Sequence, residues 1–180
     1  MAKDLYDEFD IVRETFDQAS QVLGYNLREL IDNDETKLNE TQYTQPAILT
    51  TSVAILRLLS EQGIKPDLVA GLSLGEYSAL VASGALDFAE AVALVAKRGQ
   101  YMTEAAPTGS GKMVAVMNTK AALIEEICKQ ASERGIVSPA NYNTPAQIVI
   151  GGQAEAVAYA VELLKEAGVA RLIELKVSGH

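Results

Sequence analysis

The chain has 180 residues, 48% of them hydrophobic and 22% charged, with a formal net charge of −9, a composition typical of a globular protein rather than a disordered or fibrous one. No apolar run approaches the roughly 20 residues that cross a bilayer, and the acidic N-terminus is unlike a signal peptide, so we expect a cytoplasmic protein with no membrane partner. The acidic charge also argues against nucleic acid as a partner, because that affinity comes from clustered Lys and Arg.

Cysteine and histidine are too scarce for a metal site of the zinc-finger kind. Cys128 is the only cysteine and His180 the only histidine, and these two side chains are too few to ligate the metal. Since Cys128 falls in an apolar helical pattern, we expect it to be buried rather than to act as a nucleophile. Neither a metal nor a cofactor is predicted.

The first part of the chain predicts helices. The expected segments are a helix over residues 7–23, a helical turn over 26–31, a polar connection over 32–45 and a buried helix over 47–62. Pro46 is expected in the first turn of the last helix, where its missing N–H costs nothing.

A short strand and two further helices follow. Residues 67–71 are apolar and predict a strand, residues 76–83 predict a helix that stops at Gly84, and Asp87 is the expected N-cap of a helix over 88–105. A lone strand cannot satisfy its own backbone groups. We therefore expect the strand that would pair with residues 67–71 to be missing from the sequence.

The small-residue stretch "APTGSGK" predicts a module boundary, with a first module over 1–111 and a second over 112–178. In the second module we expect strands over 113–117, 136–141, 147–150 and 171–177, and helices over 120–134 and 154–167. This βαββαβ order is that of the split βαβ unit in ferredoxin-like modules. Residues 179–180 are expected to return to the first module or to be the remnant of a tag.

The stretch "VAGLSLGEY", Val69–Tyr77, places a serine at a sharp corner between the expected strand and helix. Gly71 and Gly75 lie two residues to either side of Ser73, where the corner requires small residues. The Ser73 hydroxyl is then a candidate nucleophile. The N–H of Leu74, at the start of the helix, is a candidate donor to an oxyanion.

Five segments resemble the malonyl-CoA:acyl carrier protein transacylase family: "GLSLGEYSALVASGAL", "AVALVAKRGQYM", "YTQPAI", "GKMVAV" and "NYNTPAQIVIGG". Arg98 and Met102 match the spacing of an arginine and a methionine in that family. The resemblance implies an α/β fold, namely an α/β-hydrolase-like acyltransferase domain with an inserted ferredoxin-like subdomain. It also implies that the chain lacks the family's first strand and its last section.

The resemblance further implies a chemistry. Ser73 would attack the thioester of malonyl-CoA, and the phosphopantetheine thiol of acyl carrier protein would then take the malonyl group in a ping-pong reaction, with His180 as base. Arg98 would bind the malonyl carboxylate through two parallel hydrogen bonds. Met102 and Gln45 would also contact the substrate.

Several alternatives remain open. The Gly-x-Ser-x-Gly corner also occurs in serine esterases and lipases, and an inactive fragment could serve as a docking module for a carrier protein. His180 is either the base or part of a tag. The sequence does not choose between malonyl and methylmalonyl groups, and it fixes neither the oligomeric state nor whether this chain is active.

Overall fold

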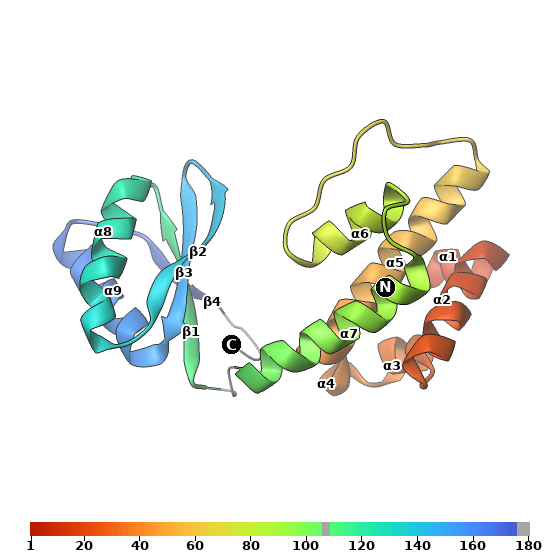
Figure 1. The fold of residues 1–180 in the computed structure, drawn as a ribbon, viewed down its shortest axis with the longest axis horizontal. Coiled ribbons are helices and arrows are strands. Elements are labelled where there is room, and N and C mark those ends of the chain that lie inside the picture. Colours follow the sequence, from red (N-terminus) through yellow and green to blue (C-terminus); the bar gives the residue numbers. More distant parts are fainter. Residues whose placement is uncertain (106–108, 176–180) are drawn as a thin grey trace. The chain divides into compact units, whose positions relative to one another are not determined.

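A computed structural model describes residues 1–105 and 109–175. The chain divides into two compact units, Met1–Met102 and Thr103–His180. Helices and strands are both present, as the predicted α/β class requires (Figure 1). The boundary expected between residues 111 and 112 falls within the second unit, and residues 179–180 lie outside the described residues.

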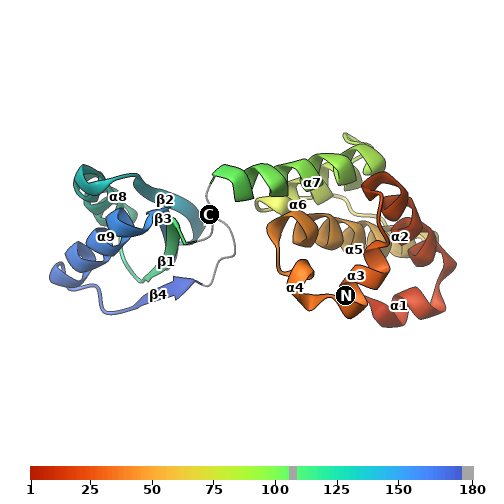
Figure 2. The same ribbon diagram turned by 90° about the horizontal axis from the view of Figure 1, so that it is seen from below.

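The regular secondary structure of the first unit's described residues is all helical. Its helices are α1 (Lys3–Glu8), α2 (Asp10–Leu23), α3 (Leu27–Asn33), α4 (Glu35–Leu38), α5 (Thr41–Glu61), α6 (Leu74–Ala82) and α7 (Phe88–Ala105). Helices α5, α6 and α7 lie side by side in both views of the molecule (Figures 1 and 2). Their apolar faces, together with those of α2 and α3, enclose a core whose most buried large side chains are Val12, Phe16, Leu27, Leu49, Val53, Val92 and Val95.

Two expectations about these helices are wrong in detail. The helix predicted over residues 7–23 is divided into α1 and α2 because Phe9 adopts an extended conformation, with φ −118° and ψ 124°. The polar connection predicted over 32–45 contains α4 and the start of α5. The missed signal is Asp34, whose Oδ1 accepts a hydrogen bond from the Lys37 N–H at 3.0 Å and so caps α4.

Helix α5 begins five residues before Pro46, which therefore lies inside the helix and not in its first turn. A proline there removes one backbone hydrogen bond. The residues from Thr41 to Gln45 contain neither glycine nor proline, so nothing in them stops the helix from starting early. The helix expected over 88–105 is confirmed, and Asp87 Oδ1 accepts hydrogen bonds from the N–H groups of Ala89 (2.8 Å) and Glu90 (3.2 Å).

The strand predicted over residues 67–71 is wrong. The segment that joins α5 to α6, drawn in yellow in Figure 1, has no regular secondary structure, and 93% of Leu68 is exposed. None of the described residues of the first unit forms a strand that could pair with it. Without a partner the backbone groups of an isolated strand stay bonded to water, and the apolar pattern alone does not produce a strand.

The second unit is a four-stranded antiparallel sheet with two helices. Its elements are β1 (Gly111–Met117), α8 (Ala121–Ala131), a 3₁₀ turn (Ser132–Arg134), β2 (Val137–Thr144), β3 (Gln147–Gln153), α9 (Ala154–Glu166) and β4 (Leu172–Leu175). The strand order is β2-β3-β1-β4. The predicted βαββαβ order of elements is confirmed. The last two residues of the strand expected over 171–177 lie outside the described part of the chain.

Helices α8 and α9 cover one face of this sheet (Figure 1). Val116 and Ile150 project from the sheet into a core with Ile124 of α8 and Val157 of α9, and none of these four side chains has exposed surface. Cys128 lies in the same core and is 2% exposed, so the prediction that it is buried is confirmed. Burial raises the pKa of its thiol to about 11, which leaves the group protonated and unreactive near neutral pH.

Candidate active site

Ser73 stands at the corner that leads into α6. It has φ 54° and ψ −111°, a conformation that residues other than glycine rarely adopt, and it is the N-cap of α6. Strain of this kind is typically found at functional sites. The Ser73 residue is exposed, so its hydroxyl is presented to solvent from a fixed backbone position.

One of the two flanking glycines is sterically required. A Cβ atom on Gly71 would lie 2.0 Å from the carbonyl carbon of Gly75 and 2.0 Å from its oxygen, so the chain before the corner passes directly over the first turn of α6. A Cβ atom on Gly75 would meet no atom within 4 Å. The expectation that both positions must be small is therefore confirmed for position 71 and not for position 75. Gly75 contributes the backbone atoms against which Gly71 packs.

Arg98 extends from α7 to Ser73. Its Nη2 donates a hydrogen bond to Ser73 Oγ at 2.9 Å, and its Nη1 donates to Gln45 Oε1 at 2.7 Å. The guanidinium carbon lies 5.6 Å from the centre of the Tyr77 ring, within the range of a cation–π contact. Residues from α5, α6 and α7 thus fix one guanidinium beside one hydroxyl.

Gln45 and Met102 form a second layer behind Arg98. Gln45 is only 5% exposed, and its Nε2 donates to Met102 Sδ at 3.2 Å while its Oε1 accepts from Arg98. Since the amide nitrogen is occupied by the sulfur, the amide oxygen is the atom that faces the guanidinium. The structure brings together four of the residues singled out in the sequence, namely Ser73, Arg98, Gln45 and Met102.

Two residues of this arrangement were not predicted from the sequence. Tyr77 covers the Arg98 guanidinium, and Gly99 allows α7 to approach α5: a Cβ atom on Gly99 would lie 2.6 Å from the Cα of Gln42 and 2.7 Å from the Thr41 carbonyl oxygen. A glycine inside a helical pattern often marks such a close approach, so Gly99 carried a usable signal. Tyr77 carried none beyond its position one turn after Ser73.

The remaining predicted residues are Leu74 and His180. Leu74 is the first residue of α6, so its N–H points out of the N-terminus of the helix, where the partial positive charge lies. His180 lies outside the described residues. Among residues 1–105 and 109–175, no group of three or more His, Cys, Asp or Glu side chains could hold a metal ion.

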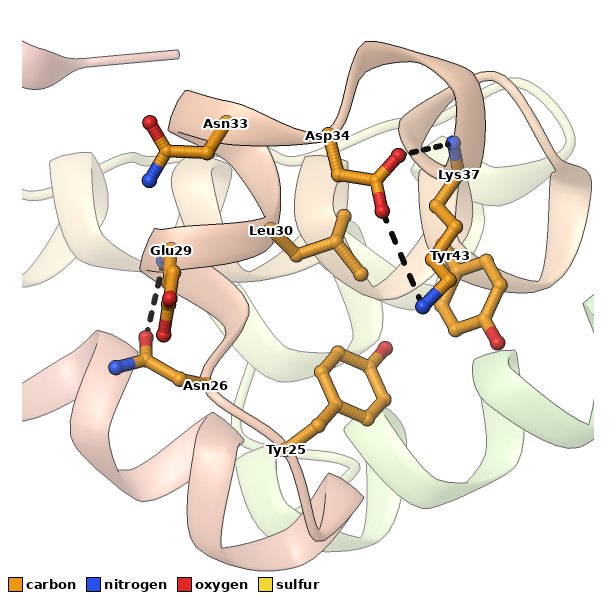
Figure 3. A pocket seen from close by; sticks show the side chains of 8 residues that line it. All are labelled: Tyr25, Asn26, Glu29, Leu30, Asn33, Asp34, Lys37 and Tyr43. Carbon is orange, nitrogen blue, oxygen red and sulfur yellow. Dashed lines mark hydrogen bonds and ion pairs between the residues drawn. The ribbon is translucent and has the colours of Figure 1, made fainter.

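A separate pocket of about 450 Å³ lies in the first unit (Figure 3). Its walls come from the end of α2 to the start of α5 and consist of Tyr25, Asn26, Glu29, Leu30, Asn33, Asp34, Lys37 and Tyr43. The rings of Tyr25 and Tyr43 meet edge to face, with their centres 5.6 Å apart. None of the predicted site residues lines this pocket, so it is distinct from the Ser73 site.

The family described as "Acyl transferase domain" matches residues 1–180. The chain therefore belongs to the acyl transferase domain family. It is 47% identical to the malonyl CoA-acyl carrier protein transacylase of Bacillus subtilis (strain 168) and 48% identical to that of Escherichia coli (strain K12), over 99% of this chain in both cases. It covers 57% of the first relative and 58% of the second, so the chain spans less than two thirds of their length.

Solved structures agree with this assignment. The crystal structure of MCAT from Streptococcus pneumoniae is 72% identical with a TM-score of 0.96, and the match covers 99% of this chain and 59% of that one. A malonyl-transacylase in complex with its type II PKS acyl-carrier protein is 46% identical with a TM-score of 0.94, again over 99% and 59%. No helix within the described residues is both long enough and apolar enough to span a membrane.

Proposed function

We propose that this chain carries the nucleophile and the carboxylate-binding arginine of an enzyme that transfers a malonyl group from coenzyme A to the phosphopantetheine thiol of acyl carrier protein. The observation that carries the proposal is the 2.9 Å hydrogen bond between Arg98 Nη2 and Ser73 Oγ. A cation this close to a nucleophile can bind the negative charge of an acyl group that carries a carboxylate next to its thioester. The names of the relatives supply the donor and the acceptor.

In the first half-reaction, Ser73 Oγ attacks the thioester carbonyl carbon and loses its proton to a base, for which His180 is the candidate. The bond from this carbon to sulfur breaks, the coenzyme A thiolate leaves and takes up a proton, and a malonyl ester remains on Ser73. The Leu74 N–H stabilises the negative charge that develops on the carbonyl oxygen, because it lies at the N-terminus of α6.

In the second half-reaction, the thiol of acyl carrier protein loses its proton to the base and attacks the ester carbon. The bond from this carbon to Ser73 Oγ then breaks, and Oγ takes up the proton. The two acyl transfers share one site, so coenzyme A leaves before the carrier protein reacts and the kinetics are ping-pong.

The cytoplasmic location expected from the sequence stays a prediction.

Arg98 binds the free carboxylate of the malonyl group. A guanidinium can form two parallel hydrogen bonds with a carboxylate, and such charge-assisted bonds are about twice as strong as neutral ones. Gln45 and Met102, which were expected to contact the substrate, are assigned instead to holding the guanidinium in place, because their polar atoms are occupied by Arg98 and by each other.

Transfer of labelled malonyl and acetyl groups to acyl carrier protein tests this proposal. We expect Ser73→Ala to abolish transfer of both groups, whereas Ser83→Ala, which alters an exposed serine at the end of the same helix, leaves transfer unchanged. We expect Arg98→Ala to lower kcat/KM for malonyl roughly hundredfold, the effect of losing hydrogen bonds to a charged group, and not to lower it for acetyl. Lys97→Ala, the exposed neighbour on α7, is the control. Equal losses for malonyl and acetyl would contradict the assignment of Arg98.

A further inference from the structure

The Ser73 hydroxyl is bonded in an unusual way for a serine at the start of a helix. A serine N-cap normally accepts a hydrogen bond from an N–H in the first turn, but Ser73 makes no such side-chain cap to α6. Its φ of 54° and ψ of −111° turn the side chain away from the helix, and Oγ accepts from Arg98 Nη2 instead. The oxygen that must attack the substrate therefore accepts a hydrogen bond from a cation.

This bond lowers the reactivity of the hydroxyl. An N–H donor on Oγ occupies a lone pair, and the positive charge of the guanidinium draws electron density away from the oxygen. A nucleophile needs that electron density for attack. A guanidinium beside a serine is thus useful for binding a carboxylate and unfavourable for attack, as long as it stays bonded to Oγ.

We propose that Arg98 caps Ser73 in the substrate-free protein, and that a carboxylate on the substrate releases the nucleophile by taking over Nη2. The exchange is favourable for a carboxylate, because a hydrogen bond between two ions is stronger than one from a cation to a neutral hydroxyl. A neutral acyl group offers only a weak carbonyl acceptor and leaves the cap in place. Selection against neutral acyl groups then acts on the rate of attack as well as on binding.

The surroundings of Arg98 allow such an exchange without loss of the side chain from the site. Nη1 stays bonded to the Gln45 amide, which is 5% exposed and itself fixed by Met102 Sδ. The guanidinium carbon lies 5.6 Å from the centre of the Tyr77 ring, and this contact supplies no hydrogen-bond acceptor that competes for Nη2. A small rotation about the contact with Gln45 therefore moves Nη2 from Ser73 Oγ to a nearby carboxylate.

This inference rests on the proposed function, since it assigns a second role to the arginine that binds malonyl. It differs from simple carboxylate binding in one measurable respect. If Arg98 only bound the substrate, the rate at which Ser73 reacts with a small neutral reagent would not depend on Arg98 or on added carboxylate. If Arg98 caps Ser73, removing the arginine or occupying it with a carboxylate exposes the hydroxyl and speeds up that reaction.

The test measures the rate at which phenylmethanesulfonyl fluoride labels Ser73, followed by mass spectrometry of the intact chain and of the peptide containing Ser73. In this reaction Oγ bonds to sulfur, and fluoride and the hydroxyl proton leave. Labelling is compared in sodium formate and in sodium chloride at equal ionic strength, for the wild-type chain and for Arg98→Met, which keeps a side chain of similar shape without N–H donors. Arg98→Leu, which also has no N–H donors, replaces Arg98→Met if the latter does not retain the wild-type circular dichroism spectrum.

We expect formate to accelerate labelling of the wild-type chain roughly tenfold, the effect of releasing one hydrogen bond to a charged group. We expect the Arg98 variant to label at the accelerated rate in both salts. The proposal is wrong if formate leaves the wild-type rate unchanged, or if it accelerates the variant equally, because formate would then act elsewhere. Incubation with malonyl-CoA in parallel separates the two claims. If Ser73 is malonylated but its labelling does not depend on formate, the cap is refuted and the proposed function is supported. If labelling depends on formate but Ser73 is not malonylated, the cap is supported and the proposed function is refuted.

Discussion

The two units of the chain differ in how their apolar segments find partners. In the second unit, all four predicted strands pair in one antiparallel sheet, and β1, β2 and β3 contribute buried side chains to the core under α8 and α9. In the first unit, the one predicted strand, residues 67–71, is unpaired, and the Leu68 side chain is 93% exposed. The same kind of sequence pattern therefore gives a strand in one place and an open segment in the other.

The difference teaches that a strand signal is conditional. Alternating or continuous apolar residues show that a segment can bury side chains, but the backbone forms a strand only against another strand. The corner at Ser73 does not depend on that condition. It is fixed locally by the close approach of Gly71 to the first turn of α6, so the candidate nucleophile is presented although the segment before it is unpaired.

Gly71→Ala is expected to have the largest effect, because it breaks the local contact that keeps the corner in place. The new Cβ would lie 2.0 Å from the Gly75 backbone, which must move and carry the start of α6 with it. We expect the rate of Ser73 acylation to fall roughly hundredfold, the cost of misplacing a reacting group by about 1 Å. Gly75→Ala adds a methyl group where no atom lies within 4 Å and should retain most of the activity. Equal rates for the two variants would contradict the role given to Gly71.

A pair of truncations sharpens the contrast between paired and unpaired segments. Ile150→Ala removes a fully buried side chain from the sheet of the second unit and should lower the free energy of unfolding of that unit by about 2 to 5 kcal/mol. Leu68→Ala, at an exposed position of the unpaired segment, should change stability by less than about 0.5 kcal/mol. Urea unfolding, with hydrogen exchange as the readout for each unit, measures the stability change of both variants. A large loss for Leu68→Ala would show that this segment is packed after all.

Alkaline pH should act on the second unit through Cys128. Burial raises the pKa of its thiol from 9.0 to about 11. Because the folded pKa lies above the unfolded one, the contribution to stability is complete below pH 9 and is lost as the pH rises towards 11. We expect a loss on the order of 1 to 3 kcal/mol over this window, measured by urea unfolding at a series of pH values. Cys128→Val has no ionisable group and should lose less stability between these pH values; parallel curves would contradict burial of the thiol.

The smallest effect is expected for two tyrosine hydroxyls, one in each unit. Within the described residues, Tyr25 Oη is buried and has no hydrogen-bond partner, so Tyr25→Phe should leave stability unchanged or increase it by up to about 1 kcal/mol. Tyr142 Oη donates to Glu125 Oε1 at 2.8 Å on an exposed surface, so Tyr142→Phe should lower stability by about 0.5 kcal/mol. Thermal unfolding of the two variants shows whether each substitution raises or lowers the stability. A clear loss in Tyr25→Phe would show that this hydroxyl does find a partner.

Local spacing accounts for what the sequence predicted well. The corner at Ser73, the capped start of α7 at Asp87 and the βαββαβ order of the second unit all depend on residues a few positions apart. The contacts around Arg98 do not. Gln45 lies 53 residues before Arg98, and a bond between them depends on how closely α5 and α7 pack. The resemblance to a known family indicated both residues as site residues. Only the structure shows that Gln45 bonds to Arg98 and that Tyr77 contacts the Arg98 guanidinium.

The most direct test of the central claim, that Ser73 beside Arg98 is the nucleophile for a malonyl thioester, is the intact mass of the chain after brief incubation with malonyl-CoA. We expect a mass increase of one malonyl group, located by peptide mapping to the segment that contains Ser73, and no increase in Ser73→Ala. A malonyl group that remains attached to Ser73→Ala, or that maps to another peptide of the wild-type chain, would contradict the claim.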